Sequence, residues 1–300
     1  YAVSVAVTGL PQVILATFGT EEQKEQYLPA LAMGETIGAF ALSEPDSGSD
    51  AGSLTSTAVR EGDQYRLNGT KFWITHGGIA DVYIVMARTG GEGPRGVSAF
   101  IVSGDTPGLS FGKKEEKMGL RASPTVEVVM RDVMIPAANL LGSEGDGFTV
   151  AMSALDSGRI TIGAISVGIA QAALETSAAY ACQRKQFKRA IIDFQGVGFM
   201  LADMACRIES GRLLVHKAAM LRDADKPYSH IAAMAKCVAT DASVAVATDA
   251  VQVLGGYGYT REYPVERYMR DAKVMQIVEG TNQVQRVVIS RHLKRVYGDI

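Results

Sequence analysis

The feature that most constrains the fold is a change of pattern along the chain. Residues 38–140 contain short runs rich in β-branched and aromatic residues, such as "YRLNGTKFWIT", "DVYIVMAR" and "TVEVVMRDVMI", separated by turn-forming residues. These runs predict antiparallel strands in a barrel or sandwich, and the pair Asn68-Gly69 predicts a hairpin turn. From about residue 147 the periodicity becomes helical. The sequence therefore predicts a β-domain followed by a helical domain.

Helix signals stand on both sides of the β-rich zone. Thr20 followed by Gln23 forms a capping box that opens "EEQKEQYLPALAMGE". Further along, one apolar stripe runs through Val197, Leu201, Met204 and Ile208. Residues 231–254 are small and nearly uncharged, which predicts a helix buried in a bundle or between subunits. We expect helices in residues 1–37, a β-domain in 38–140 and a helical bundle in 141–300.

Composition excludes several classes of protein. The net charge of −2 provides no global field for nucleic acid or an anionic membrane, so an anionic ligand needs local binding groups. Three cysteines and four histidines are scattered, which predicts neither a disulfide framework nor a metal site. The longest apolar run, 160–174, is shorter than the ~20 residues of a membrane span. The chain begins with Tyr1, so a processed product or a fragment is one expectation.

Several motifs offer chemistry, and each also has an ordinary structural explanation. The glycine cluster "LGGYGY" at 254–259 follows a helix and has Arg261 where a dinucleotide motif needs its third glycine. It is a helix–helix loop or a turn that brings backbone amides to a phosphate. "ALSEPDSGSD" at 41–50 is a turn or a ligand-holding strand end, and Trp73 is a core residue or a cofactor wall. Asp156 and Arg159 are an ion pair on one helix face or ligand contacts, and "RKQFKRAI" is a solvated face or a phosphate clamp.

Glu279 ends an apolar run and is followed by Gly280 and Thr281. Gly280 can end one helix and Thr281 can cap the next, which would make Glu279 a solvated last-turn residue. However, glutamate is unfavourable at the negative end of a helix dipole. Spacing alone favours the solvated helix corner but leaves a functional role open.

The order of six motifs, "ALSEPDSGSD", "LNGTKFWIT", "LDSGRI", "RKQF", "QVLGGYGY" and "VEGTNQVQR", resembles the acyl-CoA dehydrogenase family, in particular its short-chain, butyryl-CoA dehydrogenase-like members. The resemblance implies an α+β fold with N-terminal helices, a middle antiparallel β-domain and a C-terminal four-helix bundle. It also implies that residues 1–37 are the remnant of a longer N-terminal helical domain.

The resemblance implies a cofactor, FAD, bound between the β-domain and the bundle. The implied flavin contacts in the β-domain are Phe40, Ala41, Leu42, Ser43, Ser49, Trp73, Ile74 and Thr75. Arg184 and Gln195 would hold the pyrophosphate and adenosine side. A neighbouring subunit's FAD would meet Gln252, Val253, Leu254, Gly255 and Gly256, and the site would be completed by Thr281, Asn282 and Gln283.

The resemblance also implies the substrate contacts and the base. The acyl-CoA contacts would be Ser49, Asp156, Ser157, Gly158, Arg159 and Gly280. Glu279 matches the family's catalytic base, which removes the proton α to the thioester carbonyl while the β hydride goes to flavin N5. A minority of the family places the base on the helix matching "LDSGRI", where this chain has Ser157 and Gly158, which cannot act as bases.

This sequence departs from the family pattern at four places, two of which are Val278, where an aromatic residue often precedes the base, and His76, where Asn is common. Gln283 and Val284 replace a usual Glu-Ile, and "FKRA" at 187–190 replaces a usual "FGxP" in an FAD-contacting loop. Two alternative functions stay open: a catalytically silent member that serves in assembly or binding, and a flavin oxidase. Implied partners are an acyl-CoA, an electron-transfer flavoprotein as acceptor and further copies of the chain in a homotetramer. The implied location is the cytoplasm of a bacterium or the mitochondrial matrix of a eukaryote.

Overall fold

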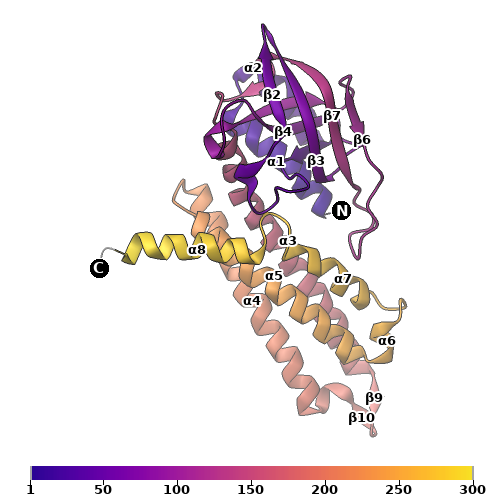
Figure 1. The fold of residues 1–300 in the computed structure, drawn as a ribbon. Coiled ribbons are helices and arrows are strands. Elements are labelled where there is room, and N and C mark those ends of the chain that lie inside the picture. The colour runs from indigo at the N-terminus through magenta and orange to yellow at the C-terminus, as the bar shows by residue number, and fades with distance from the viewer. Residues whose placement is uncertain (1, 299–300) are drawn as a thin grey trace. The chain divides into compact units, whose positions relative to one another are not determined.

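The computed structural model describes residues 2–298, which form two compact units (Figure 1). The first contains the residues up to 116 together with 121–157, and the second contains 117–120 and the residues from 158 onward. The boundary between them falls inside one long helix, α3 (Gly147–Gln183). Each unit has its own core, so we describe them separately.

The first unit begins with two helices, α1 (Ala2–Phe18) and α2 (Glu21–Met33). The predicted capping box at the start of α2 is confirmed: the Gln23 backbone amide donates to the Thr20 hydroxyl at 3.2 Å. The Thr20 amide donates to the Gln23 side-chain oxygen at 3.0 Å in return. Two otherwise unpaired groups at the helix start are thereby satisfied.

An eight-stranded sheet follows, in the order β6-β7-β3-β2-β4-β5-β8, with β1 paired to β4. The strands are β1 (Gly38–Ala41), β2 (Thr57–Glu61), β3 (Gln64–Thr75), β4 (Val82–Arg88), β5 (Val97–Ser103), β6 (Leu109–Phe111), β7 (Thr125–Pro136) and β8 (Leu140–Leu141). Most pairs are antiparallel, as predicted, but β1 and β2 each run parallel to β4. The sheet is therefore mixed.

The predicted hairpin at Asn68-Gly69 is wrong. β2 and β3 turn instead at residues 62–63, since Glu61 pairs with Gln64. Asn68 lies inside β3, where its side chain exchanges hydrogen bonds with Asp132 of β7 at 2.8 and 3.0 Å. The register shifts between Leu67 and Gly69, which marks an irregularity in the ladder. The extra residue of this bulge lies on β7, where Arg131 and Asp132 together stand opposite Asn68, and Asp132 has φ 48°.

Strand β4 explains how one sheet supports two cores. Its residues are buried on both faces, and alternate side chains enter different clusters. Ile84 and Met86 pack with α1 and the start of α3, whereas Tyr83 and Val85 pack with β3, β5 and β7. A central strand covered on both faces reads as a continuous apolar run, which is how "DVYIVMAR" appears in the sequence.

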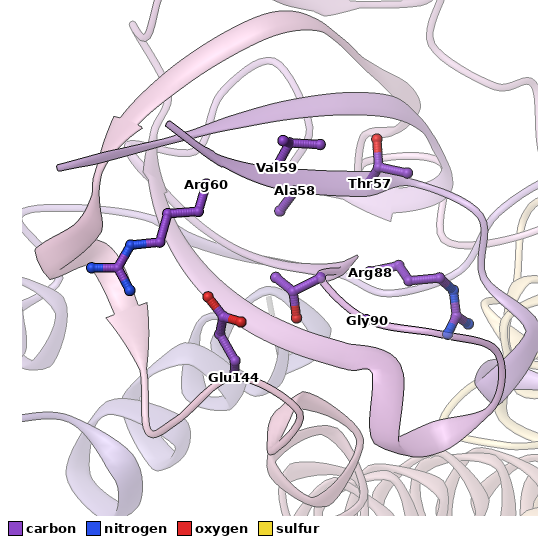
Figure 2. Close-up of a pocket in the computed structure, with 8 residues that line it drawn as sticks. Thr57, Ala58, Val59, Arg60, Arg88, Gly90 and Glu144 are labelled. Carbon is purple, nitrogen blue, oxygen red and sulfur yellow. The ribbon is translucent and has the colours of Figure 1, made fainter. Parts of the chain in front are cut away.

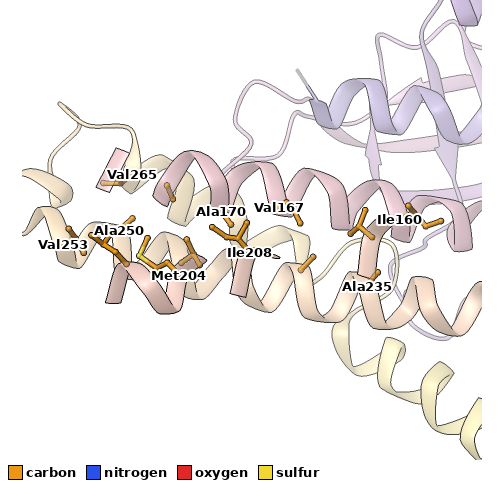
Figure 3. Close-up of a cluster of buried hydrophobic side chains, with 14 of the residues drawn as sticks. Ile160, Val167, Ala170, Met204, Ile208, Ala235, Ala250, Val253 and Val265 are labelled. Atoms are coloured by element: carbon orange, nitrogen blue, oxygen red, sulfur yellow. The ribbon is translucent and has the colours of Figure 1, made fainter. Parts of the chain in front are cut away.

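The second unit is helical. Besides α3, its elements are β9 (Lys185–Gln186), β10 (Arg189–Ala190), α4 (Gln195–Asp223), α5 (Ser229–Leu254), α6 (Gly256–Tyr259), α7 (Val265–Met275) and α8 (Asn282–Tyr297). Its core is drawn from α3, α4, α5 and α7 (Figure 3). Small residues let α4 and α5 approach closely: a Cβ on Gly211 would lie 3.1 Å from the Cα of Ala239. The prediction that 231–254 forms a buried helix is confirmed.

Two helices among the described residues, α3 and α5, are long and apolar enough to cross a membrane by length and composition alone. The apolar run 160–174, which looked too short for a span, is thus part of a 37-residue helix. The most apolar 18 residues of α5 are 67% buried within the structure. A core helix of a soluble protein passes the same test, so this finding is weak evidence for a membrane span.

Candidate active site

Glu279 lies in the corner between α7 and α8. The backbone of Glu279 has φ 57° and that of Gly280 has φ 85°, so two consecutive residues are left-handed. Thr281 then caps α8 by accepting a hydrogen bond from the Val284 amide at 3.2 Å. The predicted helix corner is therefore present. A left-handed conformation costs a non-glycine residue about 1–2 kcal/mol, and such strain is concentrated at functional sites.

The corner is held by side chains from two helices. From α8, Gln285 Nε2 donates to the carbonyl oxygens of Glu279 at 3.2 Å and Gly280 at 2.8 Å. From α5, Lys236 Nζ donates to the same Gly280 oxygen at 2.9 Å. Because both donors bind backbone oxygens, the Glu279 carboxylate is left out of this support.

The electrostatic environment of Glu279 is not that of a solvated helix end. The residue is half-buried, and its Oε2 is fully buried with no hydrogen-bond partner among the residues that the structure describes. Burial raises the pKa of Glu279 to about 7, although the positive charges of Arg159 and Lys236 act to lower it. A carboxylate with a pKa near neutrality is suited to general-base catalysis, because it is partly ionised and more basic than an exposed glutamate.

The predicted substrate segment lies on α3. Ser157 and Arg159 are buried, with exposed fractions of 5% and 4%, while Asp156 is half-buried. The charge of Arg159 acts on the Glu279 carboxylate. The structure thus brings Arg159 and Glu279 together, although 120 residues of sequence separate them.

The predicted flavin contacts of the β unit come from two segments that lie side by side. Phe40 and Ala41 end β1, and Leu42 and Ser43 follow. The Phe72 amide of β3 donates to the Ser43 carbonyl oxygen at 2.8 Å. Residues 73–75, at the end of β3, are therefore joined to residues 40–43. Ser49 is exposed in the loop beyond.

Trp73 is unusual within this pair of segments. Its side chain is 60% exposed, and its backbone φ is 62°, whereas the neighbouring Ile74 is buried and Thr75 half-buried. A left-handed, exposed tryptophan in a strand serves neither core packing nor strand geometry. It matches an aromatic surface on which a planar ligand can stack.

A second group of predicted contacts gathers at one end of the helical unit. Arg184 directly follows α3, is exposed, and places its guanidinium 5.9 Å from the centre of the Tyr257 ring. Tyr257 belongs to the glycine cluster that follows α5. Gln195 is exposed as the first residue of α4, after the β9–β10 hairpin. The hairpin turn places Lys188, which stands where the family usually has glycine, at φ 68°.

The glycines of this cluster differ in the space that a Cβ would have and in backbone conformation. A Cβ on Gly258 would lie 2.5 Å from the Val251 carbonyl oxygen, so Gly258 is required by packing within the chain. A Cβ on Gly255 or Gly256 would meet nothing within 4 Å. Gly255 has φ 60°, which favours glycine, but nothing inside the described chain demands glycine at 256. Val253 and Leu254 are buried beneath the cluster, and Gln252 is exposed.

Of the three residues predicted to complete the cofactor site, Thr281 and Asn282 use their side chains in hydrogen bonds within the chain. The Thr281 hydroxyl caps α8, and Gln283 is exposed. The Asn282 side chain is buried: its oxygen accepts from Lys236 at 2.9 Å, and its nitrogen donates to Thr240 at 2.9 Å and Asp241 at 2.6 Å. Only the backbone of Asn282 is therefore left to contact a cofactor.

A shallow pocket of about 310 Å³ lies elsewhere in the β unit (Figure 2). Its lining comprises Thr57, Ala58, Val59, Arg60, Arg88, Thr89, Gly90 and Glu144. Arg88 donates to the carbonyl oxygens of Gly52, Leu54, Gly91 and Gly93, and Glu144 accepts from the Tyr65 hydroxyl. None of the predicted site residues lines this pocket.

Among the residues that the structure describes, no group of three or more His, Cys, Asp or Glu is arranged to hold a metal.

Sequence reasoning missed Lys236, which contacts the Glu279 corner. It also missed the buried pair of Lys71 and Glu44, which lies against the predicted flavin segment: Lys71 donates to Glu44 at 2.7 Å and to the Leu42 carbonyl oxygen at 3.1 Å. A lysine inside the nearly uncharged stretch 231–254 was the available signal for Lys236. A charge on a helix that is buried nearly all round needs a specific partner.

Comparison with known proteins identifies the family. The family model for the acyl-CoA dehydrogenase middle domain matches residues 39–133, and that for the C-terminal domain matches 145–294. The chain belongs to the acyl-CoA dehydrogenase family of flavoprotein oxidoreductases, and the predicted fold class is confirmed.

Curated relatives and solved structures agree. An acyl-CoA dehydrogenase of Bacillus subtilis is 55% identical over 277 residues, which cover 92% of this chain and 73% of that protein. A short-chain specific acyl-CoA dehydrogenase of Megasphaera elsdenii is 49% identical over 302 residues, covering 98% and 79%. The structure of butyryl-CoA dehydrogenase from Megasphaera elsdenii matches with a TM-score of 0.95 and 49% identity, covering 96% and 76% of the two chains.

One further match bears on partners. A chain in a structure described as the electron transferring flavoprotein of Acidaminococcus fermentans matches with a TM-score of 0.94 and 53% identity, covering 95% of this chain and 75% of that one. Relatives also include mitochondrial proteins, such as the short-chain specific enzyme of Rattus norvegicus, which is 48% identical over 281 residues, covering 93% of this chain and 68% of that one.

Proposed function

We propose that this chain catalyses the FAD-dependent α,β-dehydrogenation of a short acyl-CoA thioester, with Glu279 as the base that removes the α proton. The observation that carries the proposal is the state of Glu279. It lies in a left-handed corner beside two cations, and one of its carboxylate oxygens is buried without a hydrogen-bond partner in the described part of the chain. This arrangement keeps a carboxylate both basic and available, which a proton acceptor requires.

The residues fit an FAD group. Exposed Trp73 provides a surface for a flat ring, and Gly255 and Gly256 leave open space above the backbone where a ligand or a neighbouring subunit can approach. Arg184, exposed beside the same cluster, would pair with phosphate oxygens. Phe40–Ser43 and Ile74–Thr75 would line the flavin, and Gln195, Gln252 and Gln283 would make polar contacts. When bound, FAD supplies the acceptor for the β hydrogen.

The remaining steps are performed by side chains of the chain itself. Ser49, Gly280 and the segment Asp156, Ser157, Gly158 and Arg159 would bind and orient the acyl-CoA. The α proton moves to a Glu279 carboxylate oxygen as the developing negative charge forms on the thioester oxygen. Burial of Oε2 keeps water from one side of the carboxylate and makes the group more basic, which favours proton transfer from the bound substrate.

The test is Glu279→Gln, which keeps the size of the side chain and removes its charge. Single-turnover reduction of the bound flavin by butyryl-CoA should slow by ~10²–10⁴-fold, the range for a lost general base. FAD content and butyryl-CoA binding should persist, because their proposed contacts lie on other residues. Reduction at a near wild-type rate would show that Glu279 is not the base.

The physiological acceptor and the assembly are part of the same proposal. We expect an electron-transfer flavoprotein to reoxidise the enzyme, in line with the match to the Acidaminococcus fermentans structure. One matching structure, however, is described as a prolyl acyl carrier protein oxidase, at 37% identity. Peroxide release during turnover without an added acceptor would favour that oxidase reading. We also expect a homotetramer, in which Gln252–Gly256 meets the FAD of a neighbour.

A further inference from the structure

Lys236 is a buried cation that the proposed mechanism leaves unexplained. Its side chain lies on α5 and is 0% exposed. Desolvation lowers the pKa of Lys236 to about 8, although the charges of Cys237, Glu279 and Asp241 act to raise it. Lysine is among the residues least often fully buried, because transferring an ammonium group out of water is costly unless it is paired. A fully buried lysine therefore needs a reason.

The hydrogen bonds of Lys236 point to that reason. Its Nζ donates to the Gly280 carbonyl oxygen at 2.9 Å and to Asn282 Oδ1 at 2.9 Å. The two acceptors lie on either side of Thr281, directly after the base. Lys236 thus ties α5 to the corner at the point where the backbone leaves its left-handed conformation. An uncharged donor would make the same two bonds at a smaller desolvation cost.

Compared with an uncharged donor, a lysine adds a positive charge. Glu279 is the nearby carboxylate whose ionised form this charge can stabilise. The other carboxylate near Lys236, Asp241, is already engaged: it pairs with Arg286 at 3.1 Å and accepts from Gln276 at 2.7 Å and Asn282 at 2.6 Å. Glu279 Oε2 has no hydrogen-bond partner within residues 2–298. Its ionised form is therefore supported by charge rather than by bonds to that oxygen.

We propose that Lys236 is a positioning residue for α-proton removal, which holds the Glu279–Gly280 corner in place and increases the ionised fraction of the Glu279 carboxylate. This inference rests on the proposed role of Glu279 as the base. The charged and titratable groups that face Lys236 are Arg159 from α3, Cys237 and Asp241 from α5, and Glu279 itself. Arg159 acts on Glu279 in the same direction as Lys236, so removal of Lys236 should weaken the effect without abolishing it.

The experiment measures flavin reduction by butyryl-CoA in single turnovers, from about pH 6 to about pH 9, in the FAD-loaded protein. Lys236→Gln keeps a hydrogen-bond donor and removes the charge, whereas Lys236→Met removes both. Both variants should move the midpoint of the acid limb upward by about one pH unit or more, as expected when an opposite charge is removed from a carboxylate. At pH 7 the reduction rate should fall by up to about tenfold and should recover as the pH rises.

Thr240→Val is the matched control on the same helix. It removes a hydroxyl that contacts the Asn282 side chain at 2.9 Å without changing any charge. If the Thr240→Val midpoint stays at the wild-type pH while that of Lys236→Gln moves, charge is the cause. Should Lys236→Met fail to fold, Lys236→Gln carries the test alone.

The inference is overturned if folded, FAD-loaded Lys236→Gln has the wild-type midpoint, or if Thr240→Val moves it equally. Glu279→Gln distinguishes this failure from failure of the proposed function. If Glu279→Gln abolishes reduction while Lys236→Gln leaves the profile unchanged, only the role of Lys236 is wrong. If Glu279→Gln reduces its flavin normally, the proposed function is wrong as well.

Discussion

Each unit of the molecule contains a buried lysine near a glutamate, and the two pairs behave in opposite ways. In the β unit, Glu44 accepts hydrogen bonds from Lys71, from the amides of Thr55 and Ser56 and from the Thr55 hydroxyl. Desolvation opposes the ionisation of Glu44, but the charge of Lys71 and these hydrogen bonds outweigh it and lower the pKa to about 2. In the helical unit, burial outweighs the positive charges of Arg159 and Lys236 and raises the pKa of Glu279 to about 7.

The difference lies in which atoms accept the hydrogen bonds of the lysine. Lys71 binds the Glu44 carboxylate directly at 2.7 Å, whereas the hydrogen bonds of Lys236 in the described chain go to the Gly280 backbone oxygen and the Asn282 side chain. A glutamate that is fully hydrogen-bonded is a permanent anion, useful for structure but too weak a base to take a proton at neutral pH. A glutamate that is near a cation yet unbound keeps its basicity. The same two residue types thus build a structural ion pair in one unit and a candidate base in the other.

The sharpest test of this comparison is the same substitution at both sites. Glu44→Gln leaves the Lys71 charge buried without a counter-ion and should lower the free energy of unfolding by about 3–5 kcal/mol. Glu279→Gln should not lower that free energy at neutral pH, since no partner of Oε2 is lost and the cost of burying the ionised carboxylate is removed. It should nevertheless slow flavin reduction by ~10²–10⁴-fold. Urea unfolding and single-turnover kinetics on both variants provide the measurements. Equal destabilisation by the two substitutions would contradict the distinction.

The two glutamates should also give stability opposite dependences on pH. The pKa of Glu44 falls from an unfolded value of about 4.3, so its contribution is present above that pH and is lost as the pH falls toward 2. The pKa of Glu279 is raised, so its contribution is present below about 4.3 and is lost as the pH rises through about 7. Urea unfolding at stepped pH checks this. Glu279→Gln should remove a decline in stability between about pH 4.3 and 7, and an unchanged slope would count against the raised pKa.

Pattern and local chemistry allowed much of the fold to be predicted from sequence. The capping box at Thr20 and the buried helix at 231–254 are decided by neighbouring residues, and the structure confirms both. The Asn68-Gly69 hairpin was wrong because its alternative, a bulge, depends on Asp132 in a distant strand. The parallel pairing of β1 with β4 likewise depends on partners that periodicity does not identify.

The candidate site was predictable only in part, for the same reason. Motif order led to Glu279, but the burial of its carboxylate oxygen depends on tertiary packing, and its two neighbouring cations come from helices 43 and 120 residues away in sequence. Lys236 has no motif of its own, and its role depends on contacts with residues 280 and 282. The roles proposed for the cofactor and substrate residues stay predictions until the experiments above are done.

A pair of glycines extends the comparison to the backbone. Gly69 in the β unit has φ 142°, and a Cβ there would lie 2.3 Å from Ser56 Oγ, so Gly69→Ala should cost about 1–3 kcal/mol of stability. A Cβ on Gly256 meets open space, so Gly256→Ala should change stability by less than about 0.5 kcal/mol. If Gly256 instead allows close approach of FAD, the alanine variant should retain less FAD on dilution. Urea unfolding and the flavin absorbance of diluted protein separate the two effects, and full FAD retention would remove the proposed reason for this glycine.

The smallest expected difference concerns two threonine caps. Thr20 and Thr281 each accept a hydrogen bond at 3.2 Å from the amide three residues on, at the starts of α2 and α8. Replacing either with alanine should cost about 1 kcal/mol of stability, the usual value for a lost cap. Only Thr281→Ala should also slow flavin reduction, because the first turn of α8 carries Gln285, which holds the backbone of the Glu279 corner. Rates are compared per bound flavin, so that any loss of FAD from the Thr281 variant is not mistaken for slower chemistry. Thr281→Ser, which keeps the capping oxygen, should restore the rate. If Thr20→Ala slows reduction as much as Thr281→Ala does, general loosening of the protein explains both, and the cap of α8 has no special connection to the base.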